Sequence, residues 1–129
     1  MVNDELWKMK RPNVIRDKSF AFALRIVAIH KSLVENKEYV LSKQLLRSGT
    51  AVGALVREAE HAESKADFIH KLAIAQKEAN ETAYWLELLF QSNYLGQTEF
   101  PTMMEDIQEL NKILASIIIT SKERKHGKW

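Results

Sequence analysis

A row of residues with alternating spacings of four and three runs from Phe68 to Leu89, within a helix predicted from residue 64 to about residue 93. Its members are Phe68, Leu72, Ala75, Ala79, Thr82, Leu86 and Leu89. This period is typical of a long helix that packs lengthwise against other helices. Thr82 is the only polar member of the row. The pattern predicts a helical bundle, and by itself it indicates no reaction.

Three further amphipathic helices are predicted, over residues 17–36, over residues 40–61 and from Thr98 or Pro101 onward. The first has a main stripe of Phe22, Ile26, Ile29 and Leu33 and a second stripe of Phe20, Ala23, Val27 and Val34. One face of the second helix is made of Leu41, Leu45, Val52, Leu55, Val56 and Ala59. The last has a stripe of Met103, Ile107, Leu110, Leu114 and Ile117. Short connections between long helices make neighbours antiparallel, so we expect an all-α, up-down-up-down four-helix bundle.

Individual residues mark the ends and one close approach of these helices. Ser64 is a good N-cap, and Asp67 three residues later resembles a capping box. Gly96 supplies a C-terminal stop, and Pro101 fits a first turn. Gly49 lies in the middle of the second helix, where it favours a close backbone approach, with a kink as the alternative.

Apolar residues also lie outside the main row of the third helix. Ile74, Tyr84, Trp85 and Leu88 are well off that row on a helical wheel. Aromatic side chains of this kind are enriched in protein interfaces. We therefore expect a homo-oligomer, with burial under an N-terminal arm that holds Trp7 and Met9 as the alternative.

Composition fits a globular, all-helical domain. The chain has 129 residues, 4 Gly, 2 Pro and no Cys, which excludes disulfides and thiolate metal sites and fits a reducing cytoplasm. We see no signal peptide and no apolar run long enough to span a bilayer, so we expect a cytoplasmic protein. We divide the chain into an arm (1–16), a bundle (17–121) and a tail (122–129).

The formal net charge of +2 is unevenly distributed, because basic residues gather toward both ends. In the tail they include Lys122, Arg124 and Lys125. Basic ends attract polyanions such as RNA, and they also serve simply as solubilising tails. On the second helix, Lys43, Arg47 and Arg57 form a sparse basic stripe. The stripe could contact phosphates, or it could pair with Glu78 or Glu81.

Candidate reactive groups do not form a convincing catalytic set. The Glu58-x-x-His61 pair resembles a di-iron half-site, and Asp67-x-x-His70 could imitate the second half. Both histidines are nevertheless predicted to point to solvent, so we expect no metal and no cofactor. We expect His30 to be packed and hydrogen-bonded. Glu78 and Glu81 lie three residues apart on the third predicted helix, but no nucleophile or partner histidine stands at a suitable spacing from them. We therefore expect these two carboxylates to form salt bridges.

Two segments resemble a known family. The stretch LLRSGTAVGA over residues 45–54, followed by Glu58-Ala59, is similar to the second-helix signature of the 23S rRNA intervening-sequence proteins, or S23-type proteins. The stretch KEANETAYWLELL over residues 77–89 resembles their third-helix signature, and residues 64–68 match its entry. The resemblance covers about residues 17–121.

The resemblance implies a left-handed antiparallel four-helix bundle that assembles as a homopentamer. A related accessory protein of diversity-generating retroelements is basic and binds a reverse transcriptase and nucleic acid, whereas the body of this chain is slightly acidic. The family name describes the location of genes and does not establish a ribosomal role. No Asn-dependent contact carries over, because Leu55 and Val56 stand where many relatives have Asn-Ile.

From these observations we expect a non-enzymatic oligomeric adaptor that binds RNA or a nucleic-acid-processing protein. The candidate contacts to nucleic acid are Lys43, Arg47, Arg57, Lys122, Arg124 and Lys125. The candidate oligomer interface is Ile74, Glu78, Glu81, Tyr84, Trp85 and Leu88. The alternative is a purely structural or protein-interaction module without nucleic-acid binding, and an enzyme or metal protein ranks last.

Overall fold

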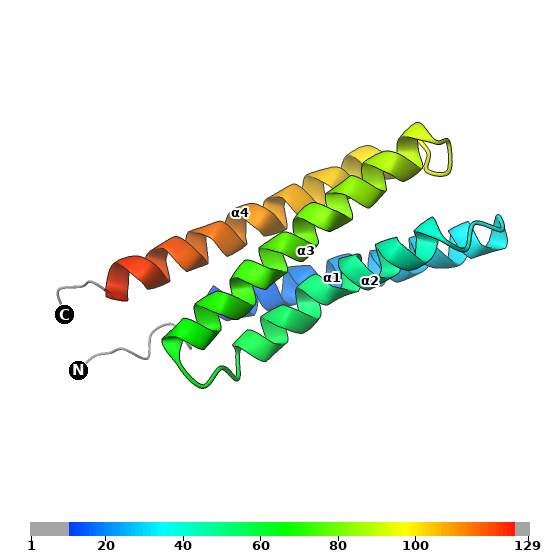
Figure 1. The fold of residues 1–129 in the computed structure, drawn as a ribbon. Helices are drawn as coiled ribbons and strands as arrows, with labels where there is room; N and C mark the ends of the chain where they lie inside the picture. The colour runs from blue at the N-terminus through cyan, green and yellow to red at the C-terminus, as the bar shows by residue number, and fades with distance from the viewer. Residues whose placement is uncertain (1–10, 126–129) are drawn as a thin grey trace.

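Four long helices account for almost all of the chain that the computed structural model describes, residues 11–125. They are α1 (Arg11–Glu35), α2 (Leu41–Ala59), α3 (Lys65–Gln91) and α4 (Glu99–Lys125). Each helix runs back along the one before it (Figure 1). The predicted all-α, up-down-up-down four-helix bundle is therefore confirmed.

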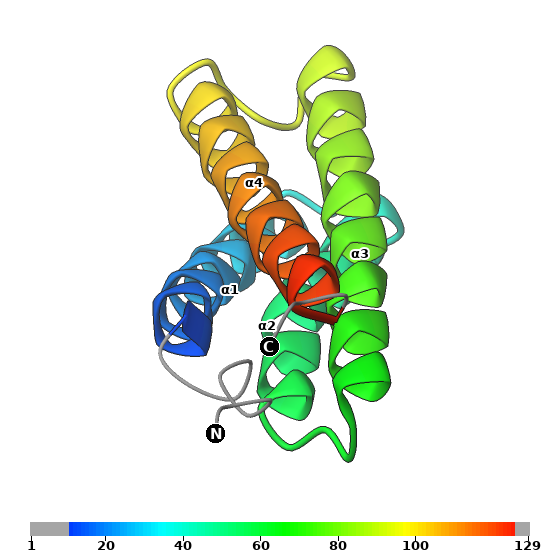
Figure 2. The ribbon, with the colours of Figure 1, turned by 90° about the vertical axis from the view of Figure 1, so that its left-hand side faces the viewer.

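The helices pack mainly against their neighbours in sequence. The pairs α1–α2, α2–α3 and α3–α4 make extensive contacts, and α1 and α4 close the bundle with a much smaller contact. Seen from the end, α1 and α3 lie on opposite sides of the molecule (Figure 2). Outward-facing residues of α1 and α3 therefore belong to two separate surfaces.

The predicted rows form the core. All seven members of the α3 row are buried, and so are the main stripes of α1 and α4. On α2 the face is buried at Leu45, Val52, Val56 and Ala59 but only partly buried at Leu41 and Leu55. Thr82, the polar member of the row, is fully buried, and its hydroxyl oxygen lies 3.0 Å from that of Ser48 on α2 and 2.8 Å from the carbonyl oxygen of Glu78.

The first helix begins earlier than the sequence indicated. Helix α1 starts at Arg11, six residues before the predicted start at Asp17. The physical reason is Ile15, which lies seven residues before Phe22, is only 1% exposed and extends the buried stripe by about two turns. Residues 11–16, which we assigned to the arm, therefore belong to α1 and to the bundle. The remainder of the arm, including Trp7 and Met9, lies outside the described residues.

The last helix also extends further than predicted. Helix α4 runs to Lys125 and so includes the first part of the predicted tail. Lys122 is exposed, while the side chains of Arg124 and Lys125 lie outside the described part of the structure.

Helices α1 and α2 approach closely at glycine. A Cβ atom on Gly49 would lie 2.7 Å from Cγ1 and 3.0 Å from Cγ2 of Ile26, a fully buried residue of α1. Four residues later, a Cβ on Gly53 would lie 3.3 Å from the backbone oxygen of Ser19. The predicted close backbone approach is confirmed, and it favours glycine at position 49 because a Cβ atom there would force the Ile26 side chain to shift.

Side chains cap the N-termini of α2 and α3. The Ser64 hydroxyl accepts a hydrogen bond from the backbone N–H of Asp67 (3.0 Å), which confirms the predicted N-cap of α3. The Asp67 carboxylate accepts from the N–H of Glu63 (3.2 Å), so the capping box is a variant one. For α2, the buried carboxylate of Glu38 accepts from the N–H groups of Leu41 (3.1 Å) and Ser42 (2.6 Å). The sequence reading missed this second cap.

Among residues 11–125, no helix has the length and apolar character needed to cross a membrane.

Candidate interaction surfaces

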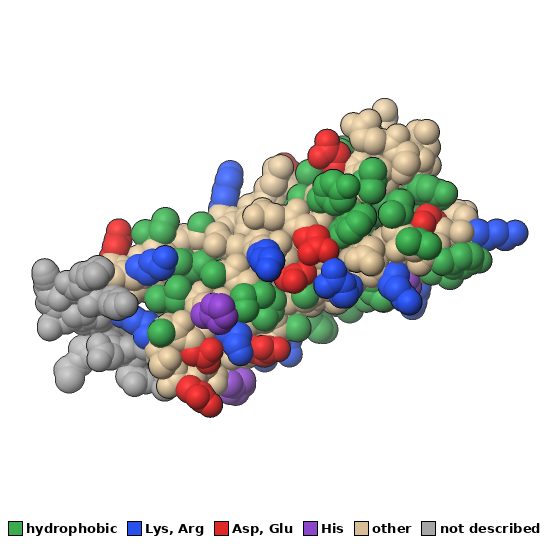
Figure 3. Space-filling view, in the orientation of Figure 1, with side chains coloured by type: hydrophobic (Ala, Val, Ile, Leu, Met, Phe, Trp, Pro, Cys, Tyr) green, Lys and Arg blue, Asp and Glu red, His purple; other side chains and the backbone are tan. Residues whose placement is uncertain are grey.

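The predicted interface residues share one side of α3, away from its buried row. Tyr84 is 58% exposed, and the other five predicted residues are half-buried: Ile74, Glu78, Glu81, Trp85 and Leu88. In Figure 3, hydrophobic side chains gather over the C-terminal half of α3, next to acidic and basic side chains along the α2–α3 boundary. The structure thus places these residues together on one face.

Glu81 organises the boundary between α3 and α2. Its Oε2 atom accepts a hydrogen bond from Nη2 of Arg47 on α2 (2.9 Å) and another from Nε1 of Trp85 (3.2 Å). The Trp85 ring also meets the Tyr84 ring edge-on, with 5.0 Å between centroids. Because Trp85 additionally packs against the core, this bundle absorbs part of the apolar surface that the sequence left without a partner. Tyr84 remains exposed.

The basic stripe of α2 is partly engaged within the chain. Arg47 pairs with Glu81, which is one of the two alternatives that the sequence left open. The guanidinium of Arg57 lies 5.0 Å from the ring centroid of Phe20 on α1, a cation–π contact. Lys43 is exposed, and within residues 11–125 it has no ion-pair partner. All three side chains stay accessible from solvent, and Arg47 is 58% exposed.

Helix α1 carries a second surface, which we call the α1 outer row and define as Phe20, Leu24, Val27, Lys31 and Val34. Its spacings are four, three, four and three, and it lies on the side of α1 opposite the core. Leu24 is 57% and Phe20 49% exposed, Val34 is also exposed, and Val27 is half-buried. The sequence reading found Phe20, Val27 and Val34 as a second stripe. It missed Leu24, which continuing the four–three period from Phe20 would have found.

The histidines lie where the sequence indicated. His61 and His70 are both exposed. Nδ1 of half-buried His30 lies 3.2 Å from the backbone oxygen of Ser42, so the expectation of a packed, hydrogen-bonded histidine is confirmed. In the described part of the chain, no three or more histidine or carboxylate side chains gather where they could hold a metal ion.

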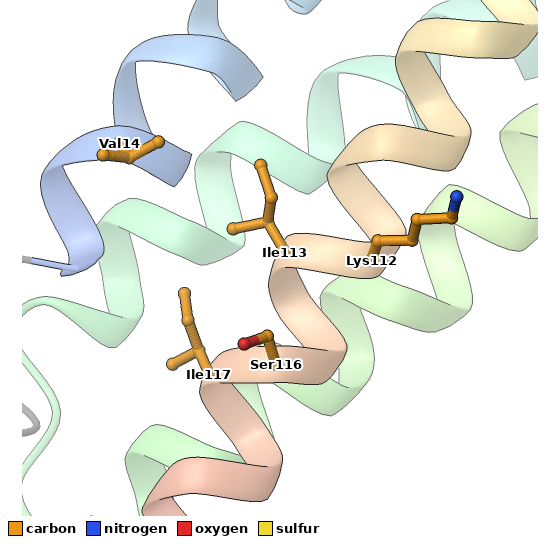
Figure 4. A pocket seen from close by; sticks show the side chains of 5 residues that line it. All are labelled: Val14, Lys112, Ile113, Ser116 and Ile117. Carbon is orange, nitrogen blue, oxygen red and sulfur yellow. The ribbon is translucent and has the colours of Figure 1, made fainter.

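A hollow of about 260 Å³ lies between the first turns of α1 and the C-terminal half of α4. Val14 of α1 faces Ile113 and Ile117 of α4 across it, and Lys112 and Ser116 of α4 complete the lining, with the Lys112 side chain extending away from Val14 (Figure 4). The lining is almost entirely apolar, and Lys112 brings the only charged group among these five residues. Further along the same seam, ion pairs join Lys18 to Glu109 (3.3 Å) and Arg25 to Asp106. The hollow offers no convergent polar groups for chemistry.

Comparison with known protein families identifies the family to which this chain belongs. The family model of the 23S rRNA-intervening sequence protein matches residues 11–116, which span α1 to α3 and most of α4. The chain belongs to this family. The resemblance that the second and third helices carry is therefore confirmed, and the matched region begins at the first residue of α1.

A solved structure from the same family supports the fold. A protein of unknown function of the S23 ribosomal protein family, from Bacteroides thetaiotaomicron, is 56% identical. The similarity covers 85% of this chain and 99% of that one, with a TM-score of 0.83. Comparison with curated proteins finds no match. The family model and this solved structure together establish the family and the architecture.

Proposed function

We propose that this protein is a non-enzymatic homo-oligomeric adaptor that works in the cytoplasm by binding rather than by catalysis. The observation that carries the proposal is the exposure of apolar side chains on two outward helix faces. These side chains are Tyr84 on α3 and the apolar members of the α1 outer row. Contiguous exposed apolar surface is typical of protein interaction sites. The absence of a convincing nucleophile and base in the sequence supports a binding role.

RNA, or a protein that processes nucleic acid, is the partner class that we propose. Support comes from exposed cations at Lys43, Arg47, Arg57 and Lys122, and from membership of a family named for the 23S rRNA intervening sequence. Arg suits phosphate because its planar guanidinium donates two parallel hydrogen bonds. Since Arg47 is held by Glu81, binding phosphate through it would require exchange of that ion pair.

A protein-interaction module without nucleic-acid binding is the second candidate. Two of the three cations on α2 already have partners within the chain, Arg47 with Glu81 and Arg57 with the Phe20 ring. Under this alternative the apolar faces are the whole functional surface, and the basic residues serve solubility.

Light scattering coupled to size exclusion tests the proposal on the full chain. The run is made at low and moderate salt, with copurifying nucleic acid followed by its absorbance ratio. We expect a particle several times the 14.9 kDa mass of one chain, and nucleic acid that dissociates as salt rises because phosphate contacts release counterions. A homopentamer is the family-based expectation. A clean monomer would refute the oligomeric adaptor, and a salt-independent assembly without nucleic acid would favour the second candidate.

Charge-removing variants then separate the two candidates. Lys43→Gln together with Arg57→Gln should weaken RNA binding and lower the slope of log affinity against log salt by about 1 for each phosphate that is no longer neutralised. Lys112→Gln on α4 removes a cation from outside the stripe and serves as the matched control. Equal RNA affinities for the double variant and the control would exclude the α2 stripe from the binding site.

A further inference from the structure

The hollow between α1 and α4 leaves apolar side chains open to water. Val14 is 53% exposed although it faces Ile113 and Ile117 across the hollow (Figure 4). Further along the seam, the ion pair of Lys18 with Glu109 bridges the two helices, but among residues 11–125 no side chain fills the space beside the first turns of α1. Apolar surface of this kind gains free energy when an apolar group displaces the water. The hollow therefore suits an apolar occupant.

The size and the walls of the hollow fit one large aromatic side chain. Its volume is about 260 Å³, whereas an enclosed apolar cavity of about 150 Å³ holds benzene. The walls are mainly aliphatic, and the exposed hydroxyl of Ser116 stands among them. An indole has a large apolar ring and one N–H that needs an acceptor when it is buried. Tryptophan therefore matches both parts of this lining.

The residues that precede α1, which we call the N-terminal segment (residues 1–10), hold a tryptophan within reach of the hollow. Trp7 is four residues before Arg11, the first residue of α1, and four extended residues span up to about 14 Å. Val14 is only three residues into the helix, about 4.5 Å along its axis. The N-terminal segment is therefore long enough to turn back along α1 and bring the Trp7 ring to the hollow.

The tryptophan near the other end of the chain is less well placed. Trp129 is four residues beyond Lys125, the last residue of α4. Counted back from Lys125, Ile117 and Ile113 lie eight and twelve residues earlier, which is about 12 and 18 Å along the helix. Because four extended residues span about 14 Å, Trp129 reaches only the nearer edge of the hollow.

The charge of α4 beside the hollow favours the N-terminal segment. Lys112 is exposed and forms no ion pair within residues 11–125. The N-terminal segment has two carboxylates, those of Asp4 and Glu5, within three residues of Trp7. A carboxylate beside the Lys112 ammonium group gains favourable Coulomb energy.

The basic residues of the N-terminal segment have a counterpart on α1. Lys8 and Lys10 follow Trp7 and lead into the helix. Asp17 is exposed, lies about one turn after Val14 and forms no ion pair within the described part of the chain, so it offers a carboxylate on that side. Neighbouring charged side chains are already paired, Lys18 with Glu109 (3.3 Å) and Arg16 with Glu60 (3.7 Å).

We propose that the N-terminal segment packs back on its own chain and inserts the Trp7 ring into the hollow, between Val14 and the two isoleucines of α4. The segment then acts as a strap across the α1–α4 seam, which has the least contact of the four seams around the bundle. This inference concerns a single chain and does not rest on the proposed function.

Tryptophan fluorescence of the full chain tests the insertion. The chain has three Trp, so the difference between the spectra of the wild type and Trp7→Phe isolates the emission of Trp7. We expect that emission at a shorter wavelength, and less quenched by acrylamide, than the emission of a free peptide of residues 1–10. Equal wavelength and quenching in protein and peptide would overturn the proposal, as would a Trp129→Phe difference that shows the more protected indole.

A charge placed in the hollow should release the ring. Val14→Glu should shift the Trp7 emission to that of the free peptide, and it should not prevent folding because the site is exposed and glutamate is favoured in a first helical turn. Ile119→Glu is the matched control, since it changes an equally exposed residue (55%) of α4 that does not line the hollow. A Val14→Glu protein whose Trp7 emission stays at the wild-type wavelength would overturn the proposed site.

Two introduced cysteines test the same contact independently and identify which chain supplies the segment. The chain has no Cys, so Leu6→Cys and Ser116→Cys add its only two thiols. Oxidised glutathione should link them within one chain, seen as a faster band at the monomer mass on a non-reducing denaturing gel. Leu6→Cys with Glu63→Cys is the control, because residue 63 is exposed in the α2–α3 turn at the same end of the bundle (Figure 1).

The outcomes of the cysteine experiment are distinct. A link to residue 116 within one chain, and little or none to residue 63, would support the proposal. Equal linking at both positions, or a link between two chains at twice the monomer mass, would overturn it. Since denaturing electrophoresis dissociates non-covalent assemblies, the result does not depend on the oligomer of the proposed function.

Discussion

At the scale of single residues, the distance between α1 and α2 depends on Gly49. The three nearest atoms to a Cβ at this position all belong to the Ile26 side chain, and Ile26 is fully buried. A β-branched side chain in a packed helix has few rotamers to move to. The glycine therefore fits a steric need that outweighs its low helix propensity.

Gly49→Ala should lower the free energy of unfolding by about 1 kcal/mol. Overpacking against Ile26 costs about 1–3 kcal/mol, and the higher helix propensity of alanine offsets about 1 kcal/mol of that. Urea denaturation followed by circular dichroism measures the difference. Gly96→Ala is the matched control: its new Cβ would have no neighbour closer than 4.0 Å and its φ is not positive, so stability should be unchanged or slightly higher. An equal effect at both positions would contradict the steric argument.

At the scale of elements, the N-terminal caps of α2 and α3 show which helix starts can be predicted from local sequence. Ser64 was identified because serine at an N-cap with an acidic residue three positions later is a local signature. Glu38 was missed because its carboxylate reaches forward to the N–H groups of residues 41 and 42 from outside the usual N-cap position. The N-cap position of α2 is held instead by Val40, whose side chain forms no capping hydrogen bond.

Removing the cap of α2 should cost more than removing that of α3. Glu38→Ala leaves two N–H groups without their acceptor in a buried setting, for about 2 kcal/mol, while Ser64→Ala exposes one N–H to water for about 1 kcal/mol. Thermal and urea unfolding of the two variants gives the order. An equal or smaller effect for Glu38→Ala would show that water replaces its carboxylate.

At the scale of the whole molecule, two outward helix faces keep apolar side chains exposed within residues 11–125. Helices α1 and α3 are on opposite sides of the bundle, and each presents exposed apolar side chains away from the shared core. A partner that binds only the folded state stabilises it by mass action. Assembly and thermal stability should therefore be linked.

The melting temperature of the wild-type protein should rise with protein concentration. Calorimetry over a roughly hundredfold concentration range should show a rise of several degrees, because copies bind the native state only. The Leu24→Glu variant should show no such dependence if the α1 outer row is part of the assembly. A concentration-independent melting temperature for the wild type would count against the oligomer.

The sequence by itself determined the helical rows and the fold class, because the period of apolar residues is a local property of the chain. It also determined the N-cap at Ser64 and the exposed positions of His61 and His70. Only the tertiary structure decided the early start of α1, since Ile15 is recognised as core only when α1 packs on its neighbours. Likewise, the pairing of Arg47 with Glu81 joins residues 34 positions apart and depends on how α2 and α3 lie together. The α1 outer row became a distinct surface only once the fold had shown which of two apolar stripes the bundle buries.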